Sequence, residues 1–172
     1  MSKRRKSIPI STIKQKNIFL IDDDLTQLTL ISSLLRKFGL EVTTFQNPTD
    51  AIKSISIGNI PDIILTDIFM PRINGWELCR ILKSDLFPQT KEVPILILSS
   101  QIVGEETKKI AKDAGAHDFI ELPTSPEILL EKLNSALTIK ETEPERIKIL
   151  IITSASDDKN QWYYKKDDPR YL

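Results

Sequence analysis

Residues 17–24 read Asn-Ile-Phe-Leu-Ile-Asp-Asp-Asp, an apolar run that ends in three acidic residues. A second run, Asp-Ile-Ile-Leu-Thr-Asp at 62–67, ends in Asp67. Short apolar runs bounded by charge are typical of buried parallel strands, and side chains at the carboxyl ends of such strands line the crevice where ligands bind. We therefore expect the acids of both runs to point into one site.

Clustered acids of this kind favour a divalent cation. Two carboxylates about 4 Å apart repel each other by about 4 kcal/mol at an effective dielectric constant near 20. Hard oxygen ligands without a neighbouring His or Cys favour Mg²⁺. The acids could instead cap the following helix, where each charge contributes about 0.3–1 kcal/mol. Capping is sufficient for Asp24, but three adjacent acids exceed what a cap requires, so we interpret Asp22 and Asp23 as metal ligands.

The rest of the chain alternates between strand and helix patterns up to residue 138. Strands are predicted at 17–21, 42–45, 62–66, 94–98 and 117–121, and helices at 25–38, 48–58, from Trp76 to Leu82, at 105–114 and around Ile128–Leu137. Parallel strands need right-handed crossovers, which place helices on both faces of the sheet. The predicted fold is therefore α/β, a doubly wound five-stranded parallel sheet.

Composition limits the function classes. The 172 residues have zero net charge, 40% hydrophobic residues and 28% charged residues, as in an ordinary globular domain. Residues 1–16 carry six basic residues and no acid, a patch that could touch a nucleic acid or an anionic membrane. Because no aromatic residue interrupts this patch, we expect a flexible, solvated N-terminal arm.

Residues 139–172 depart from the alternating pattern. They begin as a charged linker, continue with Ile-Lys-Ile-Leu-Ile-Ile at 147–152 and end in a tail with aromatic residues. The segment 147–152 has the character of an extra strand. An exposed apolar strand invites aggregation, so we expect it to dock, either on its own domain or in a dimer or partner interface formed by 144–172.

Several classes of site are excluded by single residues. Cys79 is the only cysteine, which rules out an internal disulfide and a thiolate zinc site. His117 is the only histidine and no Gly-x-Ser-x-Gly turn accompanies it, which argues against a serine hydrolase. No apolar stretch approaches the ~20 residues that span a bilayer, and no signal peptide pattern follows the basic N-terminus. We expect a cytoplasmic protein without a membrane span.

A set of short motifs connects the predicted strand ends to a known family. Asp67 is followed by Met70-Pro71 and Gly75, a hydroxyl stands at Ser99, and Gly115-Ala116 leads to Phe119 and Pro123. Together with the acids after the first strand, and in this order, these motifs make residues 17–138 resemble the receiver domain of two-component response regulators. The resemblance implies a flavodoxin-like strand order 2-1-3-4-5.

The resemblance also implies a phosphoryl-transfer site. Asp67 would accept the phosphoryl group from a phosphohistidine on a sensor histidine kinase or phosphotransfer protein. Asp23 and Asp67 would bind Mg²⁺ directly, Asp22 through water, and Phe69 through its backbone carbonyl.

Two further residues take switch roles in the family pattern. Ser99 would hydrogen-bond a phosphoryl oxygen, and Phe119 would turn inward as that hydroxyl moves. Each has a plainer interpretation, because Ser99 is also suited to a strand-end turn and Phe119 to the hydrophobic core.

One position departs from the pattern. The family has a lysine immediately before the proline that follows the fifth strand, and this chain has Leu122. That ammonium would bond the phosphoryl group, and a charge-assisted bond contributes about 1.5–3 kcal/mol. Arg72, just beyond Asp67, is a candidate substitute. The cis peptide that the resemblance implies at Leu122-Pro123 depends on Pro123, so we expect it to persist.

Three functional hypotheses follow. The first is a single-domain response regulator in a two-component phosphorelay, with altered switching and a protein effector, that catalyses at most its own phosphorylation and dephosphorylation. The second is a pseudo-receiver that binds partners without phosphoryl transfer. The third is a small Mg²⁺-dependent phosphatase, disfavoured because Phe69 stands where a second general acid belongs. We expect no direct DNA binding, because the segment after 138 is too short for a helix-turn-helix module.

Overall fold

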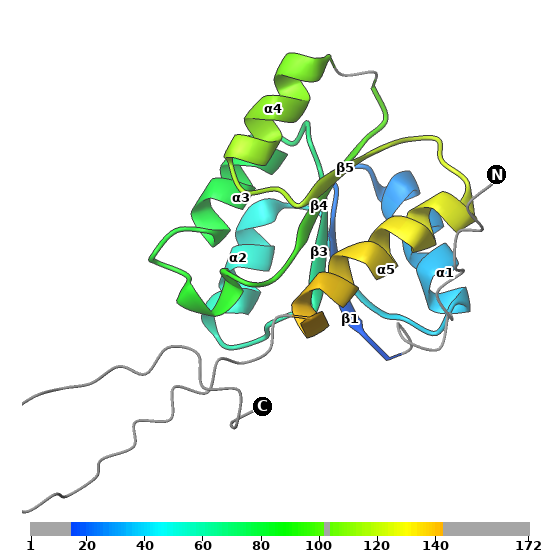
Figure 1. Cartoon of the computed structure of the whole chain (residues 1–172), viewed down its shortest axis with the longest axis horizontal. Coiled ribbons are helices and arrows are strands. Elements are labelled where there is room, and N and C mark those ends of the chain that lie inside the picture. The colour runs from blue at the N-terminus through cyan, green and yellow to red at the C-terminus, as the bar shows by residue number, and fades with distance from the viewer. Residues whose placement is uncertain (1–14, 102–103, 143–172) are drawn as a thin grey trace, which may run out of the picture.

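The computed structural model describes residues 15–101 and 104–142 and contains a five-stranded parallel sheet (Figure 1). The strands are β1 (Asn17–Ile21), β2 (Glu41–Phe45), β3 (Ile63–Asp67), β4 (Ile95–Ser99) and β5 (Asp118–Glu121). They lie in the order β2-β1-β3-β4-β5, and all four pairings are parallel. The predicted fold class and strand order are therefore confirmed.

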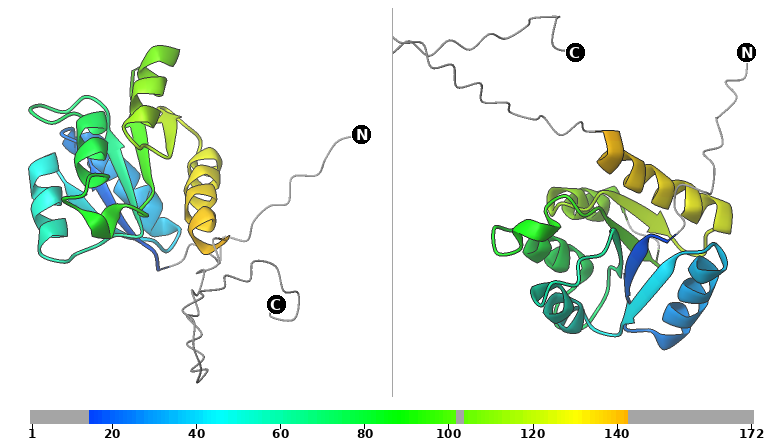
Figure 2. Two further views of the ribbon diagram at one scale, coloured as in Figure 1. Left: turned by 60° about the vertical axis from the view of Figure 1, so that its left-hand side comes forward. Right: turned by 90° about the horizontal axis from the view of Figure 1, so that it is seen from below.

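Helices cover both faces of this sheet (Figures 1 and 2). They are α1 (Leu25–Lys37), α2 (Pro48–Ser56), α3 (Gly75–Leu82), α4 (Glu105–Asp113) and α5 (Pro126–Thr142), with a short 3₁₀ helix, η2 (Pro88–Thr90). Apolar residues of α1 and α5 pack with one face of the sheet, and those of α2, α3 and α4 pack with the other. The structure thus has three layers with two hydrophobic cores.

Burial differs sharply between central and edge strands. All five residues of β3 and of β4 are buried, as are the last four of β1. The edge strand β2 exposes Glu41, Thr43 and Thr44, and β5 buries only Ile120. Strands covered on both faces need continuous apolar runs, which is why β1, β3 and β4 gave the clearest sequence patterns.

The helix ends follow local chemistry. Asp24 caps α1, Asn47 caps α2 with Pro48 in its first turn, and Asn74 forms a capping box with Glu77 at α3. After α1 the chain turns at Gly39, whose φ of 83° lies in the left-handed region that glycine favours. The N-cap predicted at Asn47 is confirmed.

The last helix is longer than the sequence pattern indicates. α5 continues to Thr142, so the boundary predicted between 138 and 139 falls inside it, and residues 139–142 are helix rather than linker. Lysine and glutamate are good helix formers, which favours continuation of the helix through Lys140 and Glu141. The sequence interpretation also omitted η2. The extra strand at 147–152, the aromatic tail and residues 1–14 of the basic arm lie outside the described residues.

Two further expectations concern the packing of Cys79 and the absence of a membrane span. Cys79 is fully buried in the core on the α3 face, and burial raises the pKa of its thiol to about 12, which fits a packing role. Among the residues that the structure describes, no helix combines the length and apolar character needed to cross a membrane.

The start of α3 touches the strand that carries Asp67, and this contact yields a test. A Cβ atom placed on Gly75 would lie 2.5 Å from the backbone oxygen of Asp67, whereas one on Gly104 would meet nothing within 4 Å. We predict that Gly75→Ala lowers the free energy of unfolding by about 1–3 kcal/mol, because backbone must move. Gly104→Ala, the matched control, should change it by less than about 1 kcal/mol. Urea denaturation of both variants measures the difference, and equal effects would contradict the close packing.

Candidate functional site

Three carboxylates meet at the carboxyl edge of the central strands. Asp22 and Asp23 follow β1, and Asp67 is the last residue of the adjacent strand β3. One carboxylate oxygen from each lies within 4.8 Å of the others. The parallel pairing of β1 with β3 brings these strand ends together, as the sequence predicts.

Asp22 is the most constrained of the three. Its side chain is buried, and Oδ1 accepts a hydrogen bond from the Asp24 amide at 2.8 Å. Oδ2 is buried without a hydrogen-bond partner among the described residues. The pKa of Asp22 is raised from 3.8 to about 6, mainly by burial and also by the carboxylates of Asp67, Asp23 and Asp24, while the hydrogen bond from the Asp24 amide opposes the rise. A buried, unpartnered carboxylate oxygen next to two other carboxylates fits a hard divalent cation.

Asp67 lies beside it with a similar electrostatic environment. It is 6% exposed, and Oδ2 accepts a hydrogen bond from the Phe69 amide at 2.7 Å. Burial raises the pKa of Asp67, and the Asp23 carboxylate adds to that rise. Within the described residues, the groups that oppose the rise are backbone amides rather than a lysine or arginine. In the described part of the chain, Asp67 is therefore a buried carboxylate whose pKa no lysine or arginine lowers.

Asp24 has a separate task. Its Oδ1 accepts hydrogen bonds from the amides of Thr26 at 2.7 Å and Gln27 at 3.3 Å, at the start of α1. These bonds lower the pKa of Asp24. The capping role expected for Asp24 is confirmed, and it leaves Asp22 and Asp23 for the acidic site.

The predicted switch residues lie on the neighbouring strands. Ser99 ends β4 and is fully buried; its Oγ donates to the Gln101 carbonyl at 2.8 Å and accepts from the Gln101 amide at 3.2 Å. Leu98, next to Ser99, pairs with Asp67 in the β3–β4 register. Phe119, on β5, is half-buried against the α3-side core. In this structure Ser99 holds a strand-end turn, and Phe119 is a partly buried core residue.

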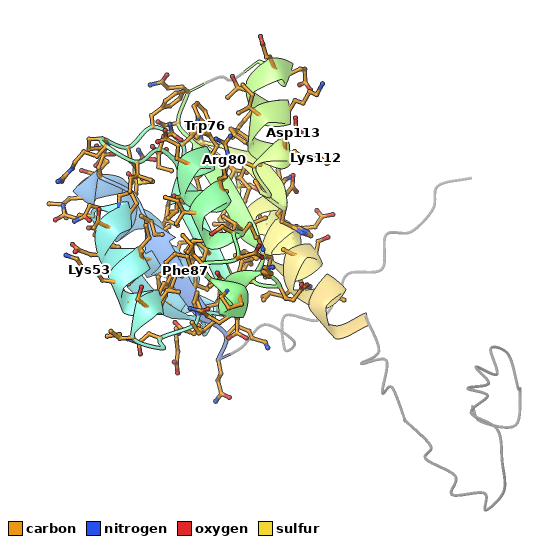
Figure 3. All side chains as sticks on the ribbon, turned by 90° about the vertical axis from the view of Figure 1, so that its left-hand side faces the viewer. Lys53, Trp76, Arg80, Phe87, Lys112 and Asp113 are labelled. Atoms are coloured by element: carbon orange, nitrogen blue, oxygen red, sulfur yellow. The ribbon has the colours of Figure 1, made fainter. Side chains whose placement is uncertain are left out.

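Aromatic side chains form part of the rim. Phe69 is 45% exposed, and its ring meets the edge of Trp76 with centroids 6.4 Å apart. Figure 3 shows Trp76 at the start of α3, with Arg80 one turn further along the helix. The sequence interpretation placed Trp76 only in the core pattern of α3. Its position in the first turn after the Asp67 loop was the available indication that it lies near the site.

Neither Leu122 nor Arg72 is among the described groups that lower the pKa of Asp67. Leu122 is half-buried and packs with the α1–α5 core. Arg72 has a left-handed φ of 74°. Its positive charge helps to lower the pKa of Asp50 on α2, although the hydrogen bonds that Asp50 receives from Asn47 and Lys53 lower that pKa more. Its charge does not contribute to the pKa of Asp67. The Leu122–Pro123 peptide is cis, in agreement with the expectation from Pro123.

Comparison with known proteins identifies the family. The family model described as the response regulator receiver domain matches residues 18–134. The chain belongs to this family. Receiver domains form a family of signalling modules, and the match covers all five strands and the three clustered acids of this one.

Individual receiver-containing proteins are similar to the chain over most of its described length. PilH of Pseudomonas aeruginosa is 31% identical over 121 residues, covering 70% of this chain and 96% of PilH. PhoB of the same species, a phosphate regulon transcriptional regulatory protein, is 34% identical over 123 residues, or 71% of this chain and 52% of PhoB.

Solved receiver structures show the same fold. The chemotaxis protein CheY4 of Vibrio cholerae is 28% identical, with a TM-score of 0.66, covering 72% of this chain and 99% of that one. A receiver domain protein from Clostridium thermocellum is 27% identical, with a TM-score of 0.65, covering 73% and 97%.

The buried Asp22 carboxylate of this receiver predicts a pH effect on the metal-free protein. Its pKa is raised on folding, so the stability linked to its protonation is complete below pH 3.8 and is lost as the pH rises through 6. Asp22→Asn should therefore raise the free energy of unfolding by about 1–3 kcal/mol at pH 8 and change it little near pH 4. Chemical denaturation in the presence of a chelator, at both pH values, measures this difference.

Asp24→Asn is the matched control for Asp22→Asn. Hydrogen bonds lower the pKa of Asp24, so its neutral replacement should not stabilise the protein at pH 8. An equal gain from Asp22→Asn at pH 8 and pH 4 would show that ionisation of Asp22 is not the cause.

Proposed function

We propose that this chain is a response regulator that accepts a phosphoryl group on Asp67 from a histidine kinase or phosphotransfer protein and signals through a partner protein. The observation that supports this most strongly is the cluster of Asp22, Asp23 and Asp67, whose oxygens approach within 4.8 Å. Asp67 is also 6% exposed, so part of its carboxylate is open to a phosphodonor group at the edge of the sheet.

In the proposed reaction a carboxylate oxygen of Asp67 attacks the phosphorus of a phosphohistidine. An O–P bond forms, the N–P bond breaks, and the imidazole nitrogen leaves with the electron pair. The Phe69 amide, which donates to Asp67 Oδ2, orients the carboxylate and leaves the other oxygen for the attack. The rise in the Asp67 pKa keeps that oxygen basic, because burial disfavours its ionised form.

The residues that hold Mg²⁺ in this proposal are Asp23 and Asp67 directly, Asp22 through water, and Phe69 through its backbone carbonyl. Bound Mg²⁺ would supply positive charge for the transferring phosphoryl oxygens. Asp22 contributes an unpartnered buried oxygen, which can accept a hydrogen bond from a water molecule bound to the cation.

Switching in this receiver is proposed to differ from the family pattern. Ser99 would have to break its two bonds to Gln101 before its hydroxyl could reach a phosphoryl oxygen. Leu122 supplies no ammonium to hold the phosphate, and its packing with the α1–α5 core keeps an apolar side chain at that position. We infer weaker coupling between phosphorylation and the movement of Ser99 and Phe119.

A second candidate function rests on the same departure. Because no cation contributes to the Asp67 environment among the described residues, a pseudo-receiver that docks partners without phosphoryl transfer is the alternative. The phosphatase hypothesis is weaker, since Phe69 offers no general acid at the second residue after Asp67. We place the protein in the cytoplasm, with no direct DNA binding and with 144–172 as the candidate homodimer segment.

The decisive experiment is incubation of the full chain with Mg²⁺ and acetyl phosphate, followed by intact mass. We expect a mass increase of one phosphoryl group in wild type, none in Asp67→Asn, and a longer-lived or larger fraction in Leu122→Lys, because the restored ammonium contributes about 1.5–3 kcal/mol to holding the phosphate.

The variants separate the hypotheses. An inert wild type beside a responsive Leu122→Lys would favour the pseudo-receiver, and a modification that survives in Asp67→Asn would refute the proposed acceptor. Multiple turnover of a generic phosphomonoester would instead support the phosphatase.

A further inference from the structure

The edge strand β2 leaves hydrogen-bonding groups directed away from the sheet. The Glu41 amide donates to the Lys16 carbonyl, and the Phe45 carbonyl accepts from the Asp22 amide. The backbone groups at both ends of β2 therefore point towards β1. Alternate residues of a parallel strand face opposite neighbours, so the groups of Val42 and Thr44 point outwards. The Val42 carbonyl is bonded by Arg36 at 2.8 Å, which leaves its amide and both groups of Thr44 available.

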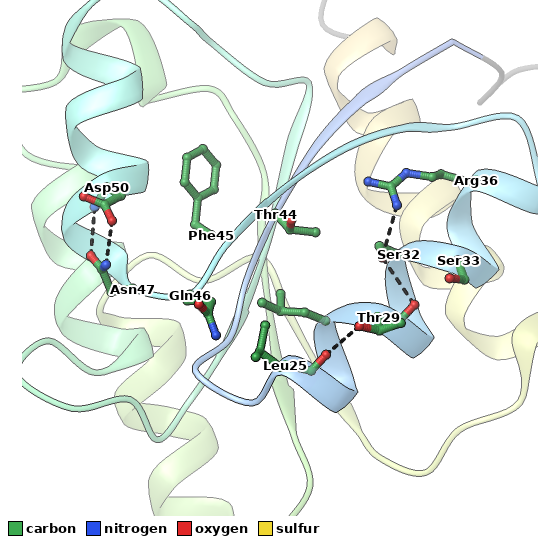
Figure 4. Close-up of a pocket in the computed structure, with 11 residues that line it drawn as sticks. Leu25, Thr29, Ser32, Ser33, Arg36, Thr44, Phe45, Gln46, Asn47 and Asp50 are labelled. Atoms are coloured by element: carbon green, nitrogen blue, oxygen red, sulfur yellow. Dashed lines mark hydrogen bonds between the residues drawn. The ribbon is translucent and has the colours of Figure 1, made fainter.

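A groove runs beside this edge. It has a volume of about 560 Å³ and lies between α1, β2 and the start of α2 (Figure 4). Leu25, Leu28 and Phe45 supply apolar surface, and hydroxyl groups such as those of Thr29 and Thr44 supply polar surface. A groove of mixed polarity along an open strand edge is suited to an added strand with alternating side chains.

The opposite edge of the sheet is protected. Asp118 of β5 pairs with Lys132 of α5 at 2.6 Å, and Glu121 pairs with Lys108 of α4 at 2.8 Å. Lys108 and Lys132 come from helices on opposite faces of the sheet, and both place a charged side chain beside β5. Charged side chains at an edge strand are a usual means of blocking strand addition. β2 itself contains no lysine and no proline, and although Arg36 occupies its Val42 carbonyl, the outward groups of Thr44 stay available, so β2 is the more receptive edge.

The chain carries a segment suited to this edge. Residues 147–152, Ile-Lys-Ile-Leu-Ile-Ile, have strong strand propensity. The preceding residues 141–146 hold three glutamates and one arginine, and the residues that follow, 153–156, are uncharged. A strand added parallel to β2 would begin near Arg36 and Lys37, where Glu41 is also exposed. In this orientation the acidic residues that precede 147 lie near the net basic residues at the amino end of β2, which favours parallel addition.

A second molecule supplies the segment more readily than the same chain does. The carboxyl end of α5 lies away from α1, whereas its amino end lies beside α1 (Figures 1 and 2). Reaching the outer side of β2 means crossing the α1 layer and the sheet edge, about 20 Å at usual packing distances of about 10 Å each. Thr142 and Ile147 are five residues apart, which spans at most about 17 Å.

We propose that residues 147–152 of one copy add as a parallel strand to the β2 edge of a second copy. Reciprocal exchange pairs both segments with both β2 edges and closes a two-fold dimer, so the contact does not propagate through further copies. Asp67 takes no part in this contact, so the dimer forms whether or not phosphoryl transfer occurs.

The test uses the full chain, with light scattering for mass and hydrogen exchange for the β2 amides. We expect twice the 19.6 kDa chain mass at micromolar concentration, with slow exchange at Val42 and Thr44. Ile149→Asp should give a monomer in which exchange at both amides is at least ten-fold faster, and Lys148→Gln, the matched control, should remain dimeric. Asp67→Asn should also remain dimeric, which keeps this result separate from that of phosphorylation.

A charge variant tests the orientation. Lys37→Glu should raise the dimer dissociation constant about five-fold, as expected for loss of an exposed pair, and Lys112→Glu on α4 should leave it unchanged. A monomeric wild type, or a dimer that Ile149→Asp leaves intact, would overturn the proposal. A monomer whose Thr44 amide is protected until Ile149 is replaced would show docking within one chain and would equally overturn it.

Discussion

The crowding of negative charge at the ends of β1 and β3 is the constraint on which the site depends. The parallel register places one carboxylate oxygen each of Asp22, Asp23 and Asp67 within 4.8 Å of the others, and burial of Asp22 and Asp67 removes water that would otherwise screen these two. Without a cation, burial and the neighbouring carboxylates raise the pKa of Asp22 and of Asp67. The same geometry therefore makes the apo site electrostatically unfavourable and makes it a good receptor for a divalent ion.

The proposed replacement of the family lysine by Leu122 would change this balance in one direction. Leu122 packs with the apolar core, and the charge of Arg72 lowers the pKa of Asp50. Neither side chain is among the groups that lower the pKa of Asp67. All compensation then falls to the ion and to backbone amides such as that of Phe69. In the proposed function, such a receiver would keep its acceptor carboxylate but lack the group that would couple a bound phosphate to movement of β4 and β5. Altered switching is the expected result.

Much of this arrangement could be predicted from the residues. Continuous apolar runs at β1, β3 and β4 indicate strands buried on both faces, and acids at their carboxyl ends indicate a shared site. Other features depend on tertiary contacts that no spacing reveals. The unpartnered oxygen of Asp22, the turn that holds the Ser99 hydroxyl, and the continuation of α5 to Thr142 belong to this group. The open β2 edge is likewise visible only once Arg36 and the paired groups of β1 are in place.

Direct calorimetric titration of the full chain with Mg²⁺ at pH 8 tests the central claim, that three carboxylates share one ion. The account predicts one site per chain, with affinity reduced at least ten-fold by Asp23→Asn, because this replacement removes an exposed ligand while leaving the buried side chains in place. Binding that is absent in wild type, or unaffected by Asp23→Asn, would contradict it.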